Sequence, residues 1–454
     1  MARSRRSFVC RNCGAESPAW AGRCNRCDAW ASIEELDAAT TEQAARSAAA
    51  VVSVQPLQEL IGSTTVPSPT GLDEFDRVLG GGLTPGSVTL LGGEPGVGKS
   101  TLTLQAGLTA SAGGASVLLV AGEEAPTQIA ARASRVGRVP PALTVIDNTS
   151  VDAVIAAMEE TRPFLVVVDS IQTVRVDDVD GSPGSVGQLR AATERLVAAA
   201  KRLQSSVIMV GHVTKDGALA GPRVIEHLVD TVLSFAGDRS GELRYLRAVK
   251  HRFGPTSEVG LFAMTHTGLG PVDDPSGRFL TDRQPGVPGS VVVPTLEGRR
   301  PVLVELQALT VDVAPEGGRV TVQGLDGRRL ALVSAVLTRR AGWSLARNDV
   351  FVSATGGAVV TEPGADLGVA VALASSLTDV PTPPELVACG EIGLGGEVRS
   401  VPRLELRLQE AYRLGFRSAI VPASAPEGPA GMTLFRAETV ADALSSLGRR
   451  PRAA

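Results

Sequence analysis

The stretch GEPGVGKST, residues 93–101, predicts the fold of the central part of the chain. It follows the apolar run SVTLL (87–91) and precedes a helical pattern that begins at Lys99. Its glycines let backbone N–H groups curl around phosphate, while Lys99 reaches the β- and γ-phosphates and Ser100 can ligate Mg²⁺. We therefore expect ATP or ADP, with Mg²⁺, to be held by Gly93, Glu94, Pro95, Gly96, Val97, Gly98, Lys99, Ser100 and Thr101.

The residues around this motif alternate between short β-branched runs and longer helical patterns, from about Leu57 to Leu280. The apolar runs SVLLVAGEE (116–124), LVVVDS (165–170) and SVIMVGHV (206–213) are separated by helical stretches such as 187–204. Apolar strands with helices between them predict βαβ units and a mostly parallel sheet. The expected fold class is therefore α/β.

Carboxylates stand at the ends of two of these runs. Asp169 ends LVVVD in the Walker B pattern, which places a carboxylate beside the metal. Glu123 and Glu124 end SVLLVAGEE, where one of them could polarise the attacking water. A solvated turn is the competing interpretation of these two glutamates, and the sequence does not separate one from the other.

Four cysteines lie near the N-terminus as two C-x-x-C pairs, ten residues apart: Cys10, Cys13, Cys24 and Cys27. Two such pairs can complete a tetrahedron around Zn²⁺, and four thiolates leave no open coordination position, so the expected role is structural. Two disulfides or a redox C-x-x-C are the alternatives. Both alternatives are disfavoured, because we expect a cytosolic chain and see no βαβ pattern around these cysteines.

Composition limits the function classes and the number of domains. The 454 residues, 43% hydrophobic and 20% charged, suffice for two to four domains. A net charge of −4 means that nucleic-acid binding cannot be argued from bulk charge. No secretory signal and no apolar run of membrane-spanning length is visible, so we expect a cytoplasmic protein without membrane association. The expected parts are a zinc finger (1–30), a linker (31–56), an ATPase domain (57–282) and a C-terminal domain (283–454).

Two further motifs carry cations or polar groups at predicted strand ends. GHVTKDG (211–217) follows SVIMV and could sense the γ-phosphate or begin a DNA-facing loop, although His212 alone could simply be packed. In KHRFG (250–254), Lys250 and Arg252 flank one residue after ELRYLRAV (242–249). This arrangement suggests contact with phosphate, including that of a neighbouring subunit, but composition alone favours a solvated turn.

With these motifs in place, the sequence resembles the bacterial RadA (Sms) family of DNA repair proteins over nearly its whole length. The resemblance is carried by the four cysteines, GGEPGVGKST (92–101), VVDSIQT (167–173), GHVTKDGALAGPRVIEHLVD (211–230) and KHRFG, in which His251 replaces the usual Asn. It implies a RecA-like ATPase core that forms a hexameric ring on single-stranded and branched DNA and promotes branch migration with RecA. It also implies that Lys250 and Arg252 act at a subunit boundary.

Residues 290–454 resemble the proteolytic domain of Lon-type proteases, but the dyad positions differ. Gly364 takes the place of the Ser nucleophile, the Lys position falls near Glu405, and no lysine follows Lys250. Without Ser or Lys, neither the nucleophile nor its base can form. We expect an α+β scaffold for ring assembly and DNA contact, with Arg328, Arg329, Arg339, Arg340 and Arg347 as the candidate DNA-binding residues.

The function that we favour from the sequence is a DNA-stimulated ATPase motor of DNA repair and recombination. The alternatives are a nucleotide switch without motor activity and an ATP-dependent protease, against which the missing dyad argues.

Overall fold

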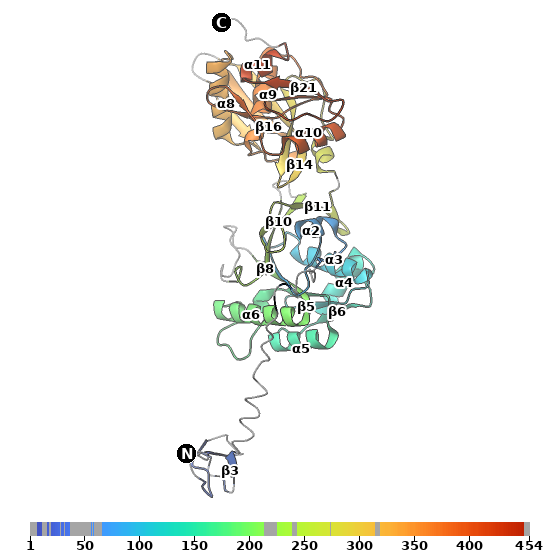
Figure 1. Ribbon diagram of the computed structural model, residues 1–454, viewed down its shortest axis with the longest axis vertical. Coiled ribbons are helices and arrows are strands. Elements are labelled where there is room, and N and C mark those ends of the chain that lie inside the picture. The colour runs from blue at the N-terminus through green and yellow to red at the C-terminus, as the bar shows by residue number, and fades with distance from the viewer. Residues whose placement is uncertain are drawn as a thin grey trace. The chain divides into compact units, whose positions relative to one another are not determined.

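The chain divides into two compact units, residues 1–64 and residues 65–454, which are described separately (Figure 1). The structure is a computed structural model. It describes residues 7–10, 16–17, 20–27, 29–30, 32–36, 56, 58, 66–212, 225–237, 243–272, 274–313 and 318–448. Within these residues, no helix has both the length and the apolar character needed to cross a membrane.

The first unit contains a small antiparallel sheet in the order β2-β1-β3, with β1 (Ser7–Cys10), β2 (Glu16–Ser17) and β3 (Ile33–Leu36). Cys10 pairs with Ile33, so the sheet includes β3, in the stretch assigned to the linker from sequence. Among the described residues here, the buried apolar cluster consists of Cys10 and Cys24, with Ala21 and Cys27 partly buried beside them. A core this small requires a metal or another cross-link for stability.

The second unit begins with a nine-stranded sheet in the order β12-β11-β10-β9-β4-β8-β7-β5-β6. Strands from β9 to β6 in this order run parallel, whereas β10, β11 and β12 form an antiparallel extension. The strands are β4 (Val88–Gly93), β5 (Val117–Ala121), β6 (Leu143–Ile146), β7 (Leu165–Asp169), β8 (Ser206–His212), β9 (Thr231–Gly237), β10 (Leu243–His251), β11 (Val259–Thr265) and β12 (Gly268–Pro271). The predicted α/β fold with a mostly parallel sheet is confirmed.

Helices cover both faces of this sheet, which is why its central strands are continuous apolar runs. Leu91 of β4 packs in a cluster with residues of α2, α3 and α4, whereas Val88 and Leu90 pack in a second cluster with residues of α5 and α6. The helices are α2 (Asp73–Val78), α3 (Lys99–Ala112), α4 (Pro126–Val136), α5 (Val151–Thr161) and α6 (Val186–Leu203), with a 3-10 turn, η2 (Ile171–Thr173). The sheet therefore lies between two helical layers.

The C-terminal part is built on a mixed seven-stranded sheet in the order β15-β16-β14-β13-β17-β20-β21, with a separate β18-β19 pair. Its strands are β13 (Ser290–Glu297), β14 (Arg300–Asp312), β15 (Val320–Gln323), β16 (Asn348–Ala354), β17 (Leu386–Ala388), β18 (Glu391–Ile392), β19 (Val398–Arg399), β20 (Ser418–Pro422) and β21 (Thr433–Ala437). The helices are α7 (Pro275–Leu280), α8 (Gly327–Arg340), α9 (Asp366–Thr378), α10 (Leu404–Arg413) and α11 (Val440–Ser445), with 3-10 turns η3 (Thr355–Gly357) and η4 (Pro363–Ala365). The almost wholly buried α9 forms the centre of this part.

The β13–β14 hairpin joins the two parts of the second unit. Arg300 Nη1 donates to both carboxylate oxygens of Glu74 in α2, at 3.0 and 3.1 Å, and Glu74 is only 4% exposed. Glu297 pairs with Arg247 of β10 at 2.7 Å. Between them, Gly298 has φ +65°, and a Cβ there would lie 2.4 Å from the carbonyl oxygen of Ser257. The tip of the hairpin therefore requires glycine.

Candidate functional site

The GEPGVGKST loop connects the end of β4 at Gly93 to the start of α3 at Lys99. Gly96 and Gly98 have φ values of +78° and +109°, a region that favours glycine. Lys99 is 5% exposed, and its Nζ donates to the carbonyl oxygens of Gly93 at 2.8 Å and Glu94 at 3.0 Å. Burial lowers the pKa of Lys99, while Asp169 and Glu123 act in the opposite direction. The ammonium thus lies across its own loop, beside two carboxylates.

Asp169 lies next to this loop at the end of β7. Burial raises its pKa, and a hydrogen bond from the Ser100 side chain counters this effect. Ser100 and Asp169 therefore bring a hydroxyl and a carboxylate oxygen together, the hard oxygen ligands that Mg²⁺ prefers. The donor set fits the metal expected here from sequence.

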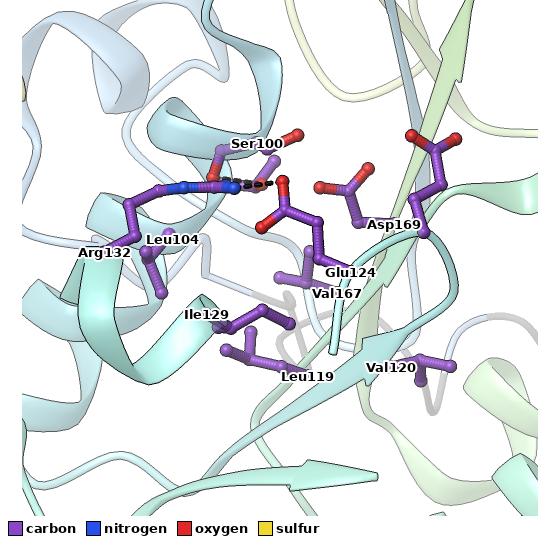
Figure 2. A pocket seen from close by; sticks show the side chains of 11 residues that line it. Ser100, Leu104, Leu119, Val120, Glu124, Ile129, Arg132, Val167 and Asp169 are labelled. Atoms are coloured by element: carbon purple, nitrogen blue, oxygen red, sulfur yellow. Dashed lines mark hydrogen bonds and ion pairs between the residues drawn. The ribbon is translucent and has the colours of Figure 1, made fainter. Parts of the chain in front are cut away.

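Glu123 and Glu124 have different surroundings. β5 pairs with β7 so that Ala121 lies opposite Asp169, which brings both glutamates to the same end of the sheet. Glu123 acts electrostatically on both Lys99 and Asp169. Glu124 also acts on Asp169 but not on Lys99, and it pairs with Arg132 of α4 (Figure 2).

These side chains share one pocket, shown in Figure 2. Its polar wall combines the two glutamates with Ser100, Asp169 and Arg132, and its remaining lining is mostly apolar. The full lining is Ser100, Thr103, Leu104, Leu119, Val120, Glu123, Glu124, Ile129, Arg132, Val167 and Asp169. The sequence patterns did not identify Arg132, because the ion pair depends on how α4 folds back toward the end of β5.

The GHVTKDG motif begins at the same end of the sheet. His212, the last residue of β8, lies in register with Gly93 at the end of β4. The parallel pairing therefore brings the first residues of this motif beside the phosphate-binding loop. Residues 213–224 and the side chain of His212 lie outside the part of the chain that the structure describes.

Lys250 and Arg252 lie near the start of β4, at the opposite end of the strands from the GEPGVGKST loop. Lys250 Nζ donates to the carbonyl oxygens of Glu226 at 2.9 Å and Val229 at 2.7 Å. Arg252 is 58% exposed and pairs with the buried Asp230 at 3.0 Å. Asp230 in turn accepts from the backbone N–H of Val88, the first residue of β4, whereas the loop follows the last residue of that strand.

His251, between the two cations, faces inward. Its Nδ1 lies 3.0 Å from Thr231 Oγ1, and burial lowers its pKa. The His251 ring is thus held against β9. β10 extends to His251, so Lys250 and His251 are the last two residues of the strand.

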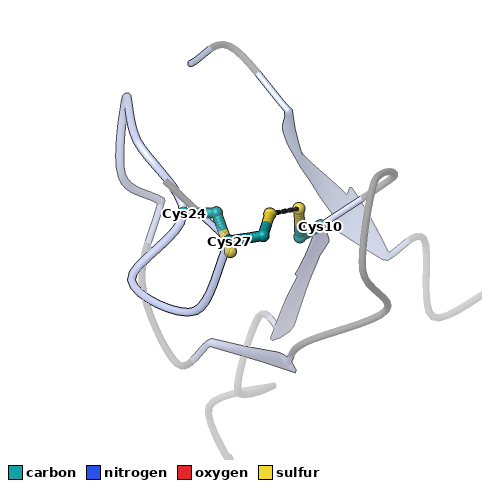
Figure 3. Close-up of side chains that lie close together, drawn as sticks. All are labelled: Cys10, Cys24 and Cys27. Carbon is teal, nitrogen blue, oxygen red and sulfur yellow. Dashed lines mark hydrogen bonds between the residues drawn. The ribbon is translucent and has the colours of Figure 1, made fainter. Parts of the chain in front are cut away.

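Three of the four predicted metal ligands converge in the first unit (Figure 3). The Sγ atoms of Cys10, Cys24 and Cys27 all lie within 4.8 Å of one another, and Cys10 Sγ is 3.7 Å from Cys27 Sγ. A tetrahedral zinc site with Zn–S bonds of about 2.3 Å has S–S edges of about 3.8 Å, whereas a disulfide bond is about 2.05 Å long. The thiol cluster therefore fits zinc. Cys13 lies outside the described residues.

The C-terminal domain places a buried arginine beside Gly364, one of the two positions predicted from sequence to replace the Lon-type dyad. Gly364 is in η4, and Arg407 of α10 packs against it with its side chain 1% exposed. Arg407 pairs with Glu362 and donates to the carbonyl oxygen of Pro294 at 2.7 Å. Glu405, in contrast, is exposed and accepts from Gln409 at 3.2 Å.

Sequence reasoning missed Arg407, although its spacing carries a signal. Leu404, Arg407, Leu408 and Ala411 form the buried face of α10 at positions i, i+3, i+4 and i+7.

The five candidate DNA-binding arginines are not equivalent. Arg329 forms an ion pair with Asp366, whose side chain is 5% exposed, and is therefore already engaged within the domain. The remaining four are exposed on α8 or just after it: Arg328, Arg339, Arg340 and Arg347.

Comparisons with known proteins agree with this architecture. A family model described as an AAA domain matches residues 68–218, one for a rubredoxin metal-binding domain matches 8–35, and one for the Lon protease (S16) C-terminal proteolytic domain matches 334–428. The chain is 44% identical to the DNA repair protein RadA of Mycobacterium tuberculosis H37Rv, over 98% of this chain and 93% of that protein. It is 43% identical to RadA of Bacillus subtilis, over 99% and 100%, and 44% identical to RadA of Escherichia coli K12, over 97% and 98%.

Proposed function

The chain belongs to the RadA family of DNA repair proteins, and we propose that it is a DNA-stimulated ATPase motor that processes recombination intermediates. In this proposal it works on single-stranded and branched DNA, promotes branch migration together with the RecA recombinase, and assembles as a hexameric ring. The observation that most supports an ATPase is the meeting of Lys99, Ser100, Glu123 and Asp169 at one end of the parallel sheet.

The proposed nucleotide site uses the loop of residues 93–101 as its phosphate cradle. When nucleotide binds, Lys99 Nζ exchanges its two carbonyl partners for the β- and γ-phosphate oxygens. The burial of Lys99 favours this exchange, because a buried ammonium is strongly attracted to phosphate. Ser100 and Asp169 hold Mg²⁺, which neutralises negative charge on the phosphates.

Glu123 is the better candidate of the two glutamates for orienting the attacking water. Both glutamates act electrostatically on Asp169, but only Glu123 also acts on Lys99, which supports a position for Glu123 near the expected phosphates. The Glu124 carboxylate already forms an ion pair with Arg132 of α4. Glu124 and Arg132 then form the outer wall of the same pocket.

Lys250 and Arg252 are proposed to act on the nucleotide of a neighbouring subunit. Thr231, which lies near Arg252, is in register with Thr89 of β4, and four residue steps along β4 lead from Thr89 to Gly93 at the start of the loop. At about 3.3 Å per residue this is about 13 Å along the strand. The distance supports action between subunits, and thus a ring, rather than action within one chain.

The C-terminal domain is proposed to be a scaffold for the ring and for DNA contact rather than a peptidase. The ion pair of the buried Arg407 with the partly buried Glu362, beside Gly364, supports this proposal, since neither residue supplies a nucleophile with a nearby base. The exposed arginines of α8 offer the positive charge that DNA phosphates require.

The test is ATP hydrolysis by the full chain, with and without single-stranded DNA, for the wild type and Lys99→Ala. We expect DNA to stimulate turnover of the wild type and Lys99→Ala to lose most turnover in both conditions while its fold is retained. Turnover that does not respond to DNA would favour the nucleotide switch. Near-normal hydrolysis by Lys99→Ala would remove the site assignment.

A further inference from the structure

Arg244 contacts the phosphate-binding loop from outside the motif. This residue of β10 donates from Nε to the carbonyl oxygen of Val97 at 3.0 Å and from Nη1 to the carbonyl oxygen of Leu243 at 3.0 Å. Gly237 lies opposite Arg244 in the β9–β10 register. A Cβ at Gly237 would lie 3.3 Å from Nη1 and 3.6 Å from Cζ, so the glycine leaves space for the guanidinium.

The contact matters because of the geometry of one peptide group. A trans peptide is planar, with its C=O and N–H pointing in opposite directions. A hydrogen bond that holds the Val97 carbonyl toward Arg244 of β10 therefore holds the Gly98 N–H pointing away from that strand. Gly98 is the N-cap of α3, with φ +109°, so this N–H belongs to the end of the helix at which anions bind.

The positive charge of Arg244 adds a second effect. A hydrogen bond from a charged donor polarises the peptide group and makes its N–H a stronger donor. It also brings a cation close to the position expected for the phosphates.

We propose that Arg244 is a positioning residue for nucleotide binding, which orients and polarises the Val97–Gly98 peptide toward phosphate. This inference rests on the proposed ATP-binding role of the loop and adds to it a residue from the antiparallel part of the sheet. Arg244 acts through the peptide and does not itself contact the nucleotide.

The same strand provides a matched control. Arg247 is also an arginine of β10, but it pairs with Glu297 of the β13–β14 hairpin and stacks over Tyr245 at 4.9 Å. Successive residues of a strand point to opposite faces, and Arg247 lies three positions from Arg244. Replacing Arg247 removes the same charge from the same strand without removing a contact to the loop.

The experiment measures the Kd for ADP with Mg²⁺ by calorimetry on the full chain, for the wild type, Arg244→Gln, Arg244→Lys, Arg247→Gln and Lys99→Ala. We expect Arg244→Gln to raise Kd about tenfold, the scale for loss of one charge-assisted hydrogen bond. Arg244→Lys should restore part of the affinity, and Arg247→Gln should match the wild type. In ATP hydrolysis, Arg244→Gln should raise KM more than it lowers kcat.

Thermal unfolding without nucleotide separates positioning from a purely structural role. We expect Arg244→Gln to unfold near the wild-type temperature without ADP and to gain less stability when ADP is added. If Arg244→Gln is poorly folded, Arg244→Met decides, because methionine keeps much of the side-chain volume but has neither charge nor donor: wild-type ADP affinity in this variant overturns the proposal, and weakened affinity supports it.

The outcomes also separate this proposal from the proposed function. Wild-type affinity in Arg244→Gln, combined with lost affinity in Lys99→Ala, overturns the role of Arg244 alone. No ADP binding by the wild type, or equal binding by Lys99→Ala, overturns the ATP site itself.

Discussion

Arg407 fills the space beside Gly364. A Cβ on residue 364 would lie 3.2 Å from Arg407 Nη1, and the guanidinium cannot move easily because Glu362 and the Pro294 carbonyl both hold it. Residue 364, the position predicted from sequence to replace a Lon-type nucleophile, is therefore adjacent to a buried cation. This packing leaves little room for a side chain at residue 364.

We expect Gly364→Ala to lower the free energy of unfolding of the C-terminal domain by about 1–3 kcal/mol, the usual cost of overpacking a rigid site. Urea unfolding measures the change. Gly187→Ala is the control, because a Cβ on that α6 residue meets nothing within 4 Å, and alanine is the better helix former. An equal or higher stability of Gly364→Ala would show that Arg407 is free to move.

Placing serine at residue 364 and lysine at residue 405, the two positions predicted from sequence, should not produce proteolysis. In Gly364→Ser/Glu405→Lys, the serine would lie beside Arg407, while residue 405 is on the exposed face of α10. A base must lie within hydrogen-bond reach of the serine hydroxyl to activate it. We expect no hydrolysis of a fluorogenic casein substrate, with or without ATP. Cleavage above the wild-type background would contradict this prediction.

Asp169→Asn should abolish ATP turnover and yet stabilise the nucleotide-free protein at neutral pH. Burial raises the folded-state pKa of Asp169, so ionisation of this group in the folded protein is unfavourable. Its contribution to stability is fully present below the ordinary pKa of an aspartic acid and is lost as the pH rises through the raised value. The advantage of Asn should therefore be largest at pH 7–8 and shrink as the pH falls.

Urea midpoints of the wild type and Asp169→Asn, measured in EDTA between about pH 5 and 8, check this expectation. Added Mg²⁺ and ADP should reverse the order, because the metal needs the carboxylate. A wild type that is more stable than Asp169→Asn at pH 8 in EDTA would contradict the predicted sign.

Arg252→Ala should retain ADP binding but lose DNA-stimulated hydrolysis. The Arg252 side chain lies at the opposite end of the strands from the phosphate-binding loop of the same chain, so it should act on a neighbouring subunit. Only the Arg252 side of the pair is exposed, and the buried Asp230 keeps its hydrogen bond from the Val88 N–H in this variant, so the fold should persist. Mixing Arg252→Ala with Lys99→Ala subunits should restore part of the activity through interfaces that combine an intact loop with an intact arginine. Full activity of Arg252→Ala alone would rule out the role.

The zinc site predicts about one metal per chain by elemental analysis, lost in Cys10→Ser and Cys24→Ser. Cys389→Ser is the matched control: Cys389 is completely buried in the C-terminal domain, and burial raises its pKa to about 12. This variant should retain the metal. The ATPase domain should unfold normally in all three variants, and metal-free wild-type protein would disprove the site.

Replacing Arg328, Arg339, Arg340 and Arg347 with Gln should weaken single-stranded DNA binding and flatten its salt dependence. Each lost phosphate contact lowers the slope of log Kd against log salt by about 0.7. The control replaces four exposed arginines of the ATPase domain, Arg135, Arg162, Arg190 and Arg202, with Gln. An unchanged slope in the first variant would exclude α8 from the DNA contact.

The sequence by itself was sufficient to predict the parallel sheet, the phosphate-binding loop and the thiol cluster, because each depends on a local pattern. Apolar runs mark strands that are buried on both faces, glycines mark the tight loop before Lys99, and C-x-x-C spacing brings two sulfurs to one ion. The order in which strands pair is not local. Only that order brings Glu123 beside Asp169, and it carries Lys250 and Arg252 away from their own loop.

Only the tertiary structure shows which arginine contacts which functional or predicted site residue. Arg132 reaches Glu124 from α4, Arg244 reaches Val97 from β10, and Arg407 reaches Gly364 from α10. The partners are distant in sequence, and the arginines occupy ordinary helix or strand positions that resemble many others in an arginine-rich chain. A long side chain finds its partner only after the backbone elements have packed, so its role follows from the fold and not from the surrounding sequence.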